Sequence, residues 1–253
     1  VELFLPVLND LQIPVLRGER KSVRAYEDRP ILEEMKQVIL ESAAQAPTAG
    51  CQQLYTILNI TDQKVKEALV DTCDHQPFIA KAPMVLVFCA DYQKWYDLFL
   101  QREEEVRKPG MGDFMLASCD ALIAAQNAVT AAQALGIGSC YIGDIMERYE
   151  THRDLLHLPK YVVPTAMVVF GYPTKQQEER EKPVRLPAQA VVSENTYRRQ
   201  EASEYAEYLS DRQGKTEEEF DRWLHAFCKR KWNSDFSAEM SRSVEVMMRQ
   251  WAE

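Results

Sequence analysis

Residues 84–90, MVLVFCA, decide the fold that the sequence predicts. This stretch is almost continuously apolar and rich in β-branched and aromatic residues, as is typical of a central strand buried on both faces. A second stretch of the same kind lies at 162–170, VVPTAMVVF, and residues 54–60 predict a further strand. We therefore expect the three segments to form the core of a sheet.

An alanine-rich helix is predicted between the second and third of these strands, from about Asp113 to Leu135. An uncharged alanine face lets two backbones approach closely, whereas a helix in solvent should carry charges on one side. We therefore expect this helix to be fully buried, at a subunit interface. Its alanines lie at positions 117, 121, 124, 125, 128, 131, 132 and 134.

The chain predicts a main domain at 1–197 and a helical extension at 198–253. The main domain should hold a short amphipathic helix near its N-terminus and a longer one from Pro30 to Ala46, ended by Pro47. The extension is highly charged, and its spaced aromatic anchors predict an arm that docks on a neighbouring subunit. Its tryptophans are Trp223, Trp232 and Trp251.

The composition excludes several classes of protein. The 253 residues carry a net charge of −9, which argues against general nucleic-acid binding but leaves room for a local basic pocket. The six cysteines and four histidines are scattered and show no metal-ligand spacing, so free thiols in a reducing cytoplasm are expected. The longest apolar runs are too short to span a bilayer, and no signal peptide is predicted.

Two basic clusters stand out in this acidic chain. The first is RKSVRAY at 20–26, preceded by Arg17, and the second is EKPVRLP at 181–187. Arginine can grip phosphate oxygens with two parallel hydrogen bonds, which a lysine cannot. The clusters therefore predict a bound anion, although the first alone is more typical of a solvated surface patch.

Four motifs occur in an order that resembles the flavin-dependent nitroreductase family. They are RKSVRAY at 20–26, APTAGCQQLYTI at 46–57, LGIGSCYIG at 135–143 and KPVRL at 182–186. The resemblance spans roughly residues 3–197. It implies an α+β fold in which helices flank a central, mainly antiparallel sheet, and an intertwined homodimer that binds FMN at its interface.

The resemblance also implies an activity. Electrons from NADH or NADPH would pass through FMN to a nitroaromatic, a quinone or a similar small planar acceptor by a ping-pong cycle. The flavin carries such chemistry and the protein supplies binding, orientation and electrostatics, so no catalytic triad is expected. Two rivals remain: an FMN-binding sensor or partner-binding module with little turnover, and a redox protein that uses Cys51 or Cys140.

The family resemblance assigns cofactor contacts to particular residues. Those expected around the phosphate, ribityl chain and pyrimidine edge are Arg20, Lys21, Ser22, Arg24 and Arg185. Those expected to reach the flavin from the partner subunit are Pro47, Thr48, Ala49, Cys51 and Gln53. Those expected near the flavin ring are Gln76, Tyr141, Ile142 and Gly143.

Several of these positions have a second interpretation. Cys51 stands where the family often has asparagine, and a thiol bonds weakly, so Cys51 could equally be inert in the interior. Gln76 could be a solvated loop residue, and Arg185 could form an exposed salt bridge. Aromatic residues at 92–99 show helical spacing, which favours a core role over a substrate lid.

Overall fold

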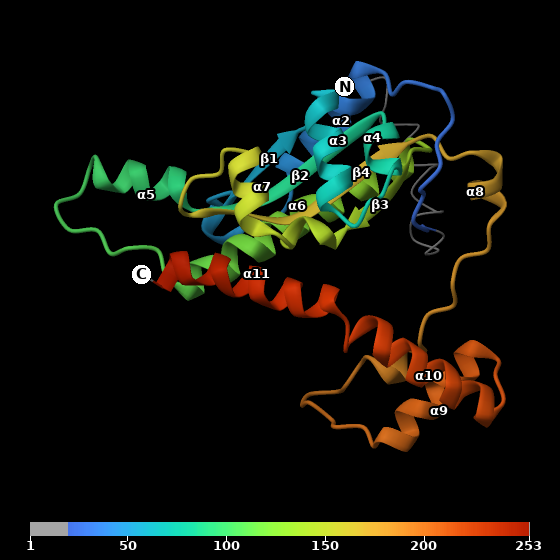
Figure 1. Cartoon of the computed structure of the whole chain (residues 1–253). Helices are drawn as coiled ribbons and strands as arrows, with labels where there is room; N and C mark the ends of the chain where they lie inside the picture. The colour runs from blue at the N-terminus through green and yellow to red at the C-terminus, as the bar shows by residue number, and fades with distance from the viewer. Residues whose placement is uncertain (1–19, 253) are drawn as a thin grey trace. The chain divides into compact units, whose positions relative to one another are not determined.

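The computed structural model describes residues 20–252 (Figure 1). Arg17 and the predicted N-terminal helix lie outside those residues. Within the described chain, backbone contacts define one unit of residues 20–180 with 239–252 and another of residues 181–238. This division differs from the expected boundary after residue 197 in two ways. The second unit begins at residue 181, and residues 239–252 belong with the first unit.

The first unit is built on a four-stranded antiparallel sheet with the order β1-β2-β4-β3. Its strands are β1 Tyr55–Asn59, β2 Met84–Asp91, β3 Gly138–Ile142 and β4 Val162–Gly171. Every residue of β2 and β4 is buried, which confirms them as the central strands. The sequence prediction missed β3, because its glycine and short length indicated a turn.

Helices α2 Glu33–Ala44 and α6 Met111–Ala134 cover one face of the sheet (Figure 1). The alanines of α6 pack in one apolar cluster with Ile39, Phe88 and Phe170. Within the single chain, Met115, Leu122 and Ile123 are 62%, 46% and 41% exposed, so full burial of α6 would require the expected subunit interface and stays a prediction. The alanine stripe covers only the side of the helix that faces the sheet.

By length and composition, α6 could cross a membrane. Its only charged residues are Asp113 and Asp120, and both are buried in the fold. Asp113 accepts hydrogen bonds from the Arg107 guanidinium, and Asp120 accepts them from a neighbouring loop. We therefore interpret α6 as the core helix of a globular unit.

The other face of the sheet is covered by shorter elements. These are α3 Gln63–Thr72, α4 Phe78–Lys81, the 3-10 turn η2 Gly143–Met146 and α7 Tyr149–Leu155. Their apolar side chains form a second buried cluster with the side chains that β2, β3 and β4 present on this face of the sheet. The side chain of Asp62 caps α3 by accepting from the Lys64 amide at 2.8 Å.

The basic segment 20–26 runs along the edge of the sheet beside β3. Ser22 pairs with Ser139, and the Val23 amide donates to the Ser139 carbonyl at 3.0 Å. A Cβ atom on Gly138 would lie 2.5 Å from Val23 Cγ2. The segment can therefore lie this close to the sheet only because Gly138 has no side chain.

Helix α11, Asp235–Ala252, ends in the first unit. Trp251 is 1% exposed and makes edge-on ring contacts with Tyr92, Phe114 and Tyr161. This part of the C-terminal segment thus docks on its own chain, and the expected docking of the extension on a partner stays a prediction.

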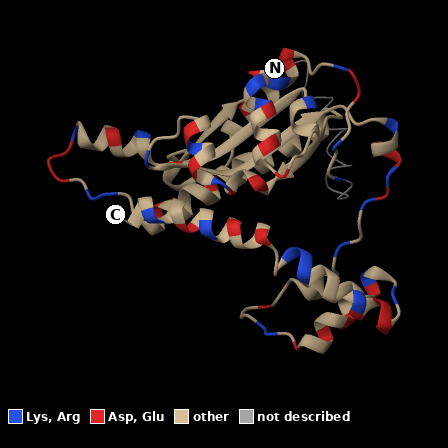
Figure 2. Ribbon diagram, viewed as in Figure 1, with Lys and Arg blue, Asp and Glu red and all other residues tan. Residues whose placement is uncertain are grey.

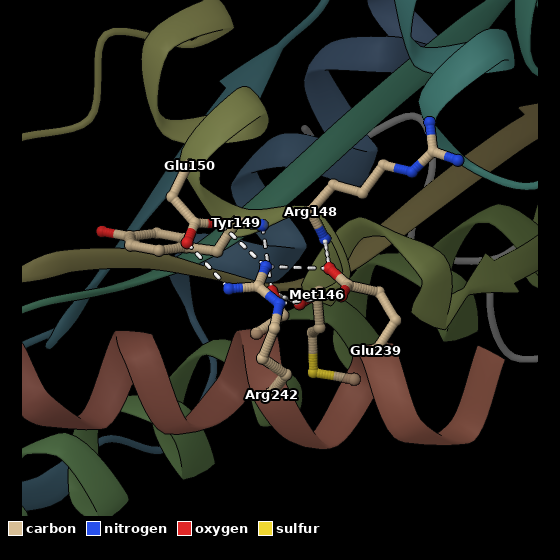
Figure 3. A network of polar contacts seen from close by, with 7 residues as sticks. Met146, Arg148, Tyr149, Glu150, Glu239 and Arg242 are labelled. Atoms are coloured by element: carbon tan, nitrogen blue, oxygen red, sulfur yellow. Dashed lines mark hydrogen bonds and ion pairs between the residues drawn. The ribbon is translucent and has the colours of Figure 1, made fainter. Parts of the chain in front are cut away.

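Polar contacts fix α11 beside the start of α7 (Figure 3). The Arg242 guanidinium makes two hydrogen bonds to Glu150, at 2.8 and 2.9 Å, and further bonds to Glu239. The Ser243 hydroxyl accepts from the Tyr149 amide and donates to the Met146 carbonyl. The Tyr149 amide is one of the backbone donors that the start of α7 leaves free, and Ser243 satisfies it.

The second unit contains η3 Ala188–Ala190, α9 Ala202–Gln213, α10 Glu217–Lys231 and the first turn of α11. A capping box between Thr216 and Glu219 starts α10. The remaining helices of the first unit are α5 Gln93–Leu100 and α8 Lys175–Glu179. Within the described residues of the second unit, Ala190 and Phe220 are the buried apolar side chains, so this unit has a small core.

We predict that Gly138→Ala destabilises the fold by about 1–3 kcal/mol, because the new methyl group overlaps Val23. Chemical denaturation would measure the change. Gly112→Ala is the matched control, since a Cβ at Gly112 meets nothing within 4 Å and alanine favours a helix. In the double variant Gly138→Ala with Val23→Ala the two losses should not add. Additive losses would contradict the proposed overlap.

Candidate functional site

Three arginines gather at the β3 edge of the first unit. Arg20 and Arg24 come from the basic segment, and Arg180 follows α8 and donates to the Ser22 carbonyl at 2.5 Å. All three lower the pKa of the Cys140 thiol, although burial outweighs them and keeps that pKa raised. Arg180 lies one residue before the second basic cluster and was not among the residues predicted from the sequence.

Arg20 has a buried guanidinium nitrogen, Nη1, that makes no hydrogen bond within the described chain. A buried charged donor without a partner is costly, so such a group indicates a place for an acceptor. Because arginine donors match phosphate oxygens in geometry and charge, an anion is the acceptor that fits best.

Lys21 has a different environment from the one expected. Its ammonium group donates to the carbonyls of Glu178 and Arg180 and so holds the end of α8 against the basic segment. Arg185 is exposed and belongs to the second unit, in the segment between α8 and η3. The structure therefore groups Arg20, Ser22 and Arg24 in the first unit and leaves Arg185 in the other.

The predicted ring contacts lie around the turn that follows β3. Tyr141 is half-buried, and burial raises its pKa to about 12. The Ile142 side chain belongs to the second apolar cluster, so only its backbone could reach a ligand. Gly143 is exposed at the start of η2.

Gln76 joins this turn through its side chain. The amide nitrogen donates to the Cys73 carbonyl at 3.0 Å and to Asp144 Oδ2 at 3.1 Å. Two residues later, the Phe78 ring lies 5.9 Å from the Arg24 guanidinium. The contacts thus connect Arg24, the Gln76 loop and the Gly143 turn into one polar arc.

The loop 47–53 is held elsewhere, by the buried carboxylate of Asp120 on α6. Asp120 is 3% exposed and accepts from the Thr48 hydroxyl and from the amides of Ala49 at 3.0 Å and Leu54 at 3.2 Å. Thr48 Oγ1 in turn accepts from the Gln53 amide at 2.7 Å. The hydroxyl of Thr48 is therefore already occupied by the loop itself.

The backbone of this loop adopts an uncommon conformation. Gly50, Cys51 and Gln53 have φ angles of 56°, 56° and 50°. Positive φ is costly for residues with a side chain and persists only where the surroundings enforce it. Cys51 and Pro47 are exposed and Ala49 is partly exposed, while the Gln53 side chain donates to the Ala44 carbonyl at 2.9 Å. Asp120 was missed, although it is the single acid in the middle of an uncharged helix.

The aromatic residues of α5 have structural partners. The Trp95 indole donates to the Gln52 carbonyl at 2.7 Å, and its ring lies 5.5 Å from that of Phe99. Tyr96 makes an edge-on contact with Tyr161. These contacts give the aromatic residues packing partners, as the packing interpretation expects, while their rings stay partly exposed.

Acidic side chains gather around Glu147, close to the Gly143 turn. Glu147 is 7% exposed, its Oε1 atom has no hydrogen-bond partner in the described chain, and burial raises its pKa to about 7. Nearby Asp144, Asp74 and Glu239 raise this pKa further, and Arg148 opposes them. No group of metal-ligating side chains occurs within residues 20–252.

We predict that Glu147→Gln stabilises the protein at pH 8 but not at pH 5. The raised pKa means that folded Glu147 binds a proton over a range where the unfolded chain has lost it, so stability falls as pH rises from about 4.5 to about 7. Glutamine lacks this charge and should raise Tm at pH 8 by about 2–4 °C. Exposed Glu103→Gln is the control, and a Tm gain equal at both pH values would contradict the prediction.

Comparison with known proteins identifies the family. The nitroreductase family matches residues 18–172. An oxygen-insensitive NADPH nitroreductase of Salmonella typhimurium is 35% identical over 185 residues, which cover 73% of this chain and 74% of the relative. An FMN reductase (NADPH) of Bacillus subtilis is 33% identical, over 70% of this chain and 71% of the relative.

The similarity extends to solved structures. The NfrA1 nitroreductase from B. subtilis superposes with a TM-score of 0.77 at 27% identity, covering 96% of this chain and 98% of that one. The expected α+β fold is thus confirmed. The chain belongs to the nitroreductase family.

Proposed function

We propose that the protein is an FMN-dependent oxidoreductase that passes electrons from NADH or NADPH to nitroaromatic, quinone or similar planar acceptors in a ping-pong cycle. When bound, FMN supplies the chemistry of hydride acceptance and electron release. The names of the NADPH nitroreductase and the FMN reductase among the relatives support this proposal. The chain itself contributes binding and orientation.

The observation that carries the proposal is the unpartnered buried nitrogen of Arg20. It lies with Arg24 and Arg180 in a chain whose net charge is −9, so the local positive charge departs from the overall balance. This arrangement fits the phosphate of FMN, which would accept the free donor of Arg20. Arg24 would hold the adjoining part of the cofactor. The contact of Arg185 with the phosphate, implied by the family resemblance, stays a prediction.

The turn after β3 and the Gln76 loop suit the flavin ring. The backbone of Gly143 is exposed and lacks a Cβ, so a planar ring could approach it closely. Backbone amides at such a turn stabilise negative charge that develops nearby. Loop 47–53 would reach a second cofactor from the partner subunit, through its exposed residues.

The proposal is tested by the visible spectrum of the purified protein, with and without FMN, and by adding NADH or NADPH without oxygen. We expect the nucleotide to bleach the bound flavin and a quinone to restore its visible absorption. Flavin that binds but stays oxidised with both nucleotides would instead support the sensor alternative, and a protein that takes up no FMN would contradict both.

In the same titrations, Arg20→Ala should weaken FMN binding about 10- to 100-fold, as expected for a lost charge-assisted contact. Arg102→Ala removes an exposed charge that follows α5 and is the matched control. An unchanged FMN affinity in Arg20→Ala would remove Arg20 from the cofactor site.

We also propose that the protein is a homodimer that uses α6 as part of its interface. The exposed side of α6 carries Met115, Leu116, Cys119, Leu122 and Ile123 and no charged residue. Basic and acidic residues are interspersed over the ribbon (Figure 2), whereas the sequence of α6 contains no lysine or arginine. A contiguous apolar stripe of this kind is typical of a surface that a partner covers.

The double variant Leu122→Glu with Ile123→Glu should be monomeric, because each glutamate would bury a charge at the proposed interface. Light scattering after size exclusion should give about twice the chain mass of 29.2 kDa for wild type and the single mass for the variant. Leu32→Glu, at an exposed apolar residue outside the stripe, is the control. A monomeric wild type or a dimeric variant would contradict this interface.

A further inference from the structure

Gln76 is held so that only one end of its side-chain amide is free. Its nitrogen donates to the Cys73 carbonyl at 3.0 Å and to Asp144 Oδ2 at 3.1 Å. Both partners accept hydrogen bonds and the amide nitrogen has two protons, so both donors are occupied. The carbonyl oxygen Oε1 is the group left to meet a ligand.

We propose that Asp144 is a positioning residue that fixes Gln76 with its carbonyl oxygen toward the cofactor, and so selects a ring that offers an N–H. This inference rests on the proposed function. An uncharged amide could turn over about its last torsion, since its two ends have the same shape. A carboxylate can only accept, and its hydrogen bonds are stronger than those of neutral groups, so it opposes that turn.

The surroundings of the two residues support a fixed geometry. Asp74 and His75, just before Gln76, have φ angles of 57° and 49°, a strain that needs support from neighbouring structure. Asp144 follows Gly143 in η2, so its bond to Gln76 joins the Gln76 loop to the Gly143 turn. A turned amide would place its oxygen against both the Asp144 carboxylate and the Cys73 carbonyl.

The chemistry of the flavin ring decides what this carbonyl could recognise. In oxidised FMN, N3–H is the only N–H of the ring system, and the other ring heteroatoms accept hydrogen bonds. An outward-facing carbonyl therefore gains a hydrogen bond only from N3–H. Methylation of N3 would leave that carbonyl without a donor and put a methyl group against it.

The experiment compares binding of FMN with binding of N3-methyl-FMN, measured by quenching of flavin fluorescence. Wild type should prefer FMN by at least about 10-fold, which corresponds to the loss of one buried hydrogen bond. In Asp144→Asn only the Cys73 carbonyl still opposes the turned orientation of the Gln76 amide, so the preference should fall to about 3-fold or less. The ratio of the two affinities is a readout that simple destabilisation does not change.

Asp74→Asn is the matched control, because it removes a neighbouring negative charge without touching the bond to Gln76 and asparagine tolerates positive φ. It should keep the wild-type preference. Gln76→Met provides a second variant with similar shape and no amide, and it should lose the preference even if Asp144→Asn does not fold.

The outcomes separate this inference from the proposed function. A wild type that binds FMN, with an unchanged preference in Asp144→Asn or Gln76→Met, overturns the role of Asp144 alone. A wild type that binds neither flavin overturns the proposed function and this inference with it.

Discussion

Burial of β2 and β4 on both faces is the constraint on which the rest of the first unit depends. Each strand contributes apolar side chains to both sides, so helices must cover the sheet above and below. The strand order places β3 at one edge of the sheet, with β4 as its only strand neighbour in the described chain. The free side of β3 can therefore pair with the basic segment 20–26. The long α6 occupies one face, which leaves the other to the short elements that carry Gln76 and Gly143.

Close approach at that open edge turns the fold into a candidate site. Gly138 and Gly171 lack the Cβ atoms that would collide with Val23 and Tyr26. The segment therefore lies against β3 and β4, and its arginines are brought beside Cys140 and Tyr141. The close approach of the backbone segments thus gathers positive charge at one edge of the sheet, although the chain is acidic overall.

The sequence predicted the features that repeat a pattern and missed those that depend on a single contact. Two-sided strands have a continuous apolar signature, so β2 and β4 were predictable, whereas the short β3 has none. The arginine cluster was visible, but nothing in the sequence shows that Lys21 holds the end of α8 or that Arg180 joins the cluster. Asp120 and Asp144 act through partners 66 or more residues away, a separation that only the fold can close.

Asp120 links loop 47–53 to helix α6. Its carboxylate faces inward and holds a loop in which Cys51 and Gln53 have positive φ, a strain of about 1–3 kcal/mol at each residue. Its neighbours in α6, Leu122 and Ile123, face outward on the uncharged stripe. A partner subunit that covers that stripe would hold the turn of α6 that carries Asp120, and Asp120 in turn holds loop 47–53. Dimerisation and the geometry of loop 47–53 would then be coupled through one rigid element, α6, in addition to the proposed approach of the loop to a cofactor at the dimer interface.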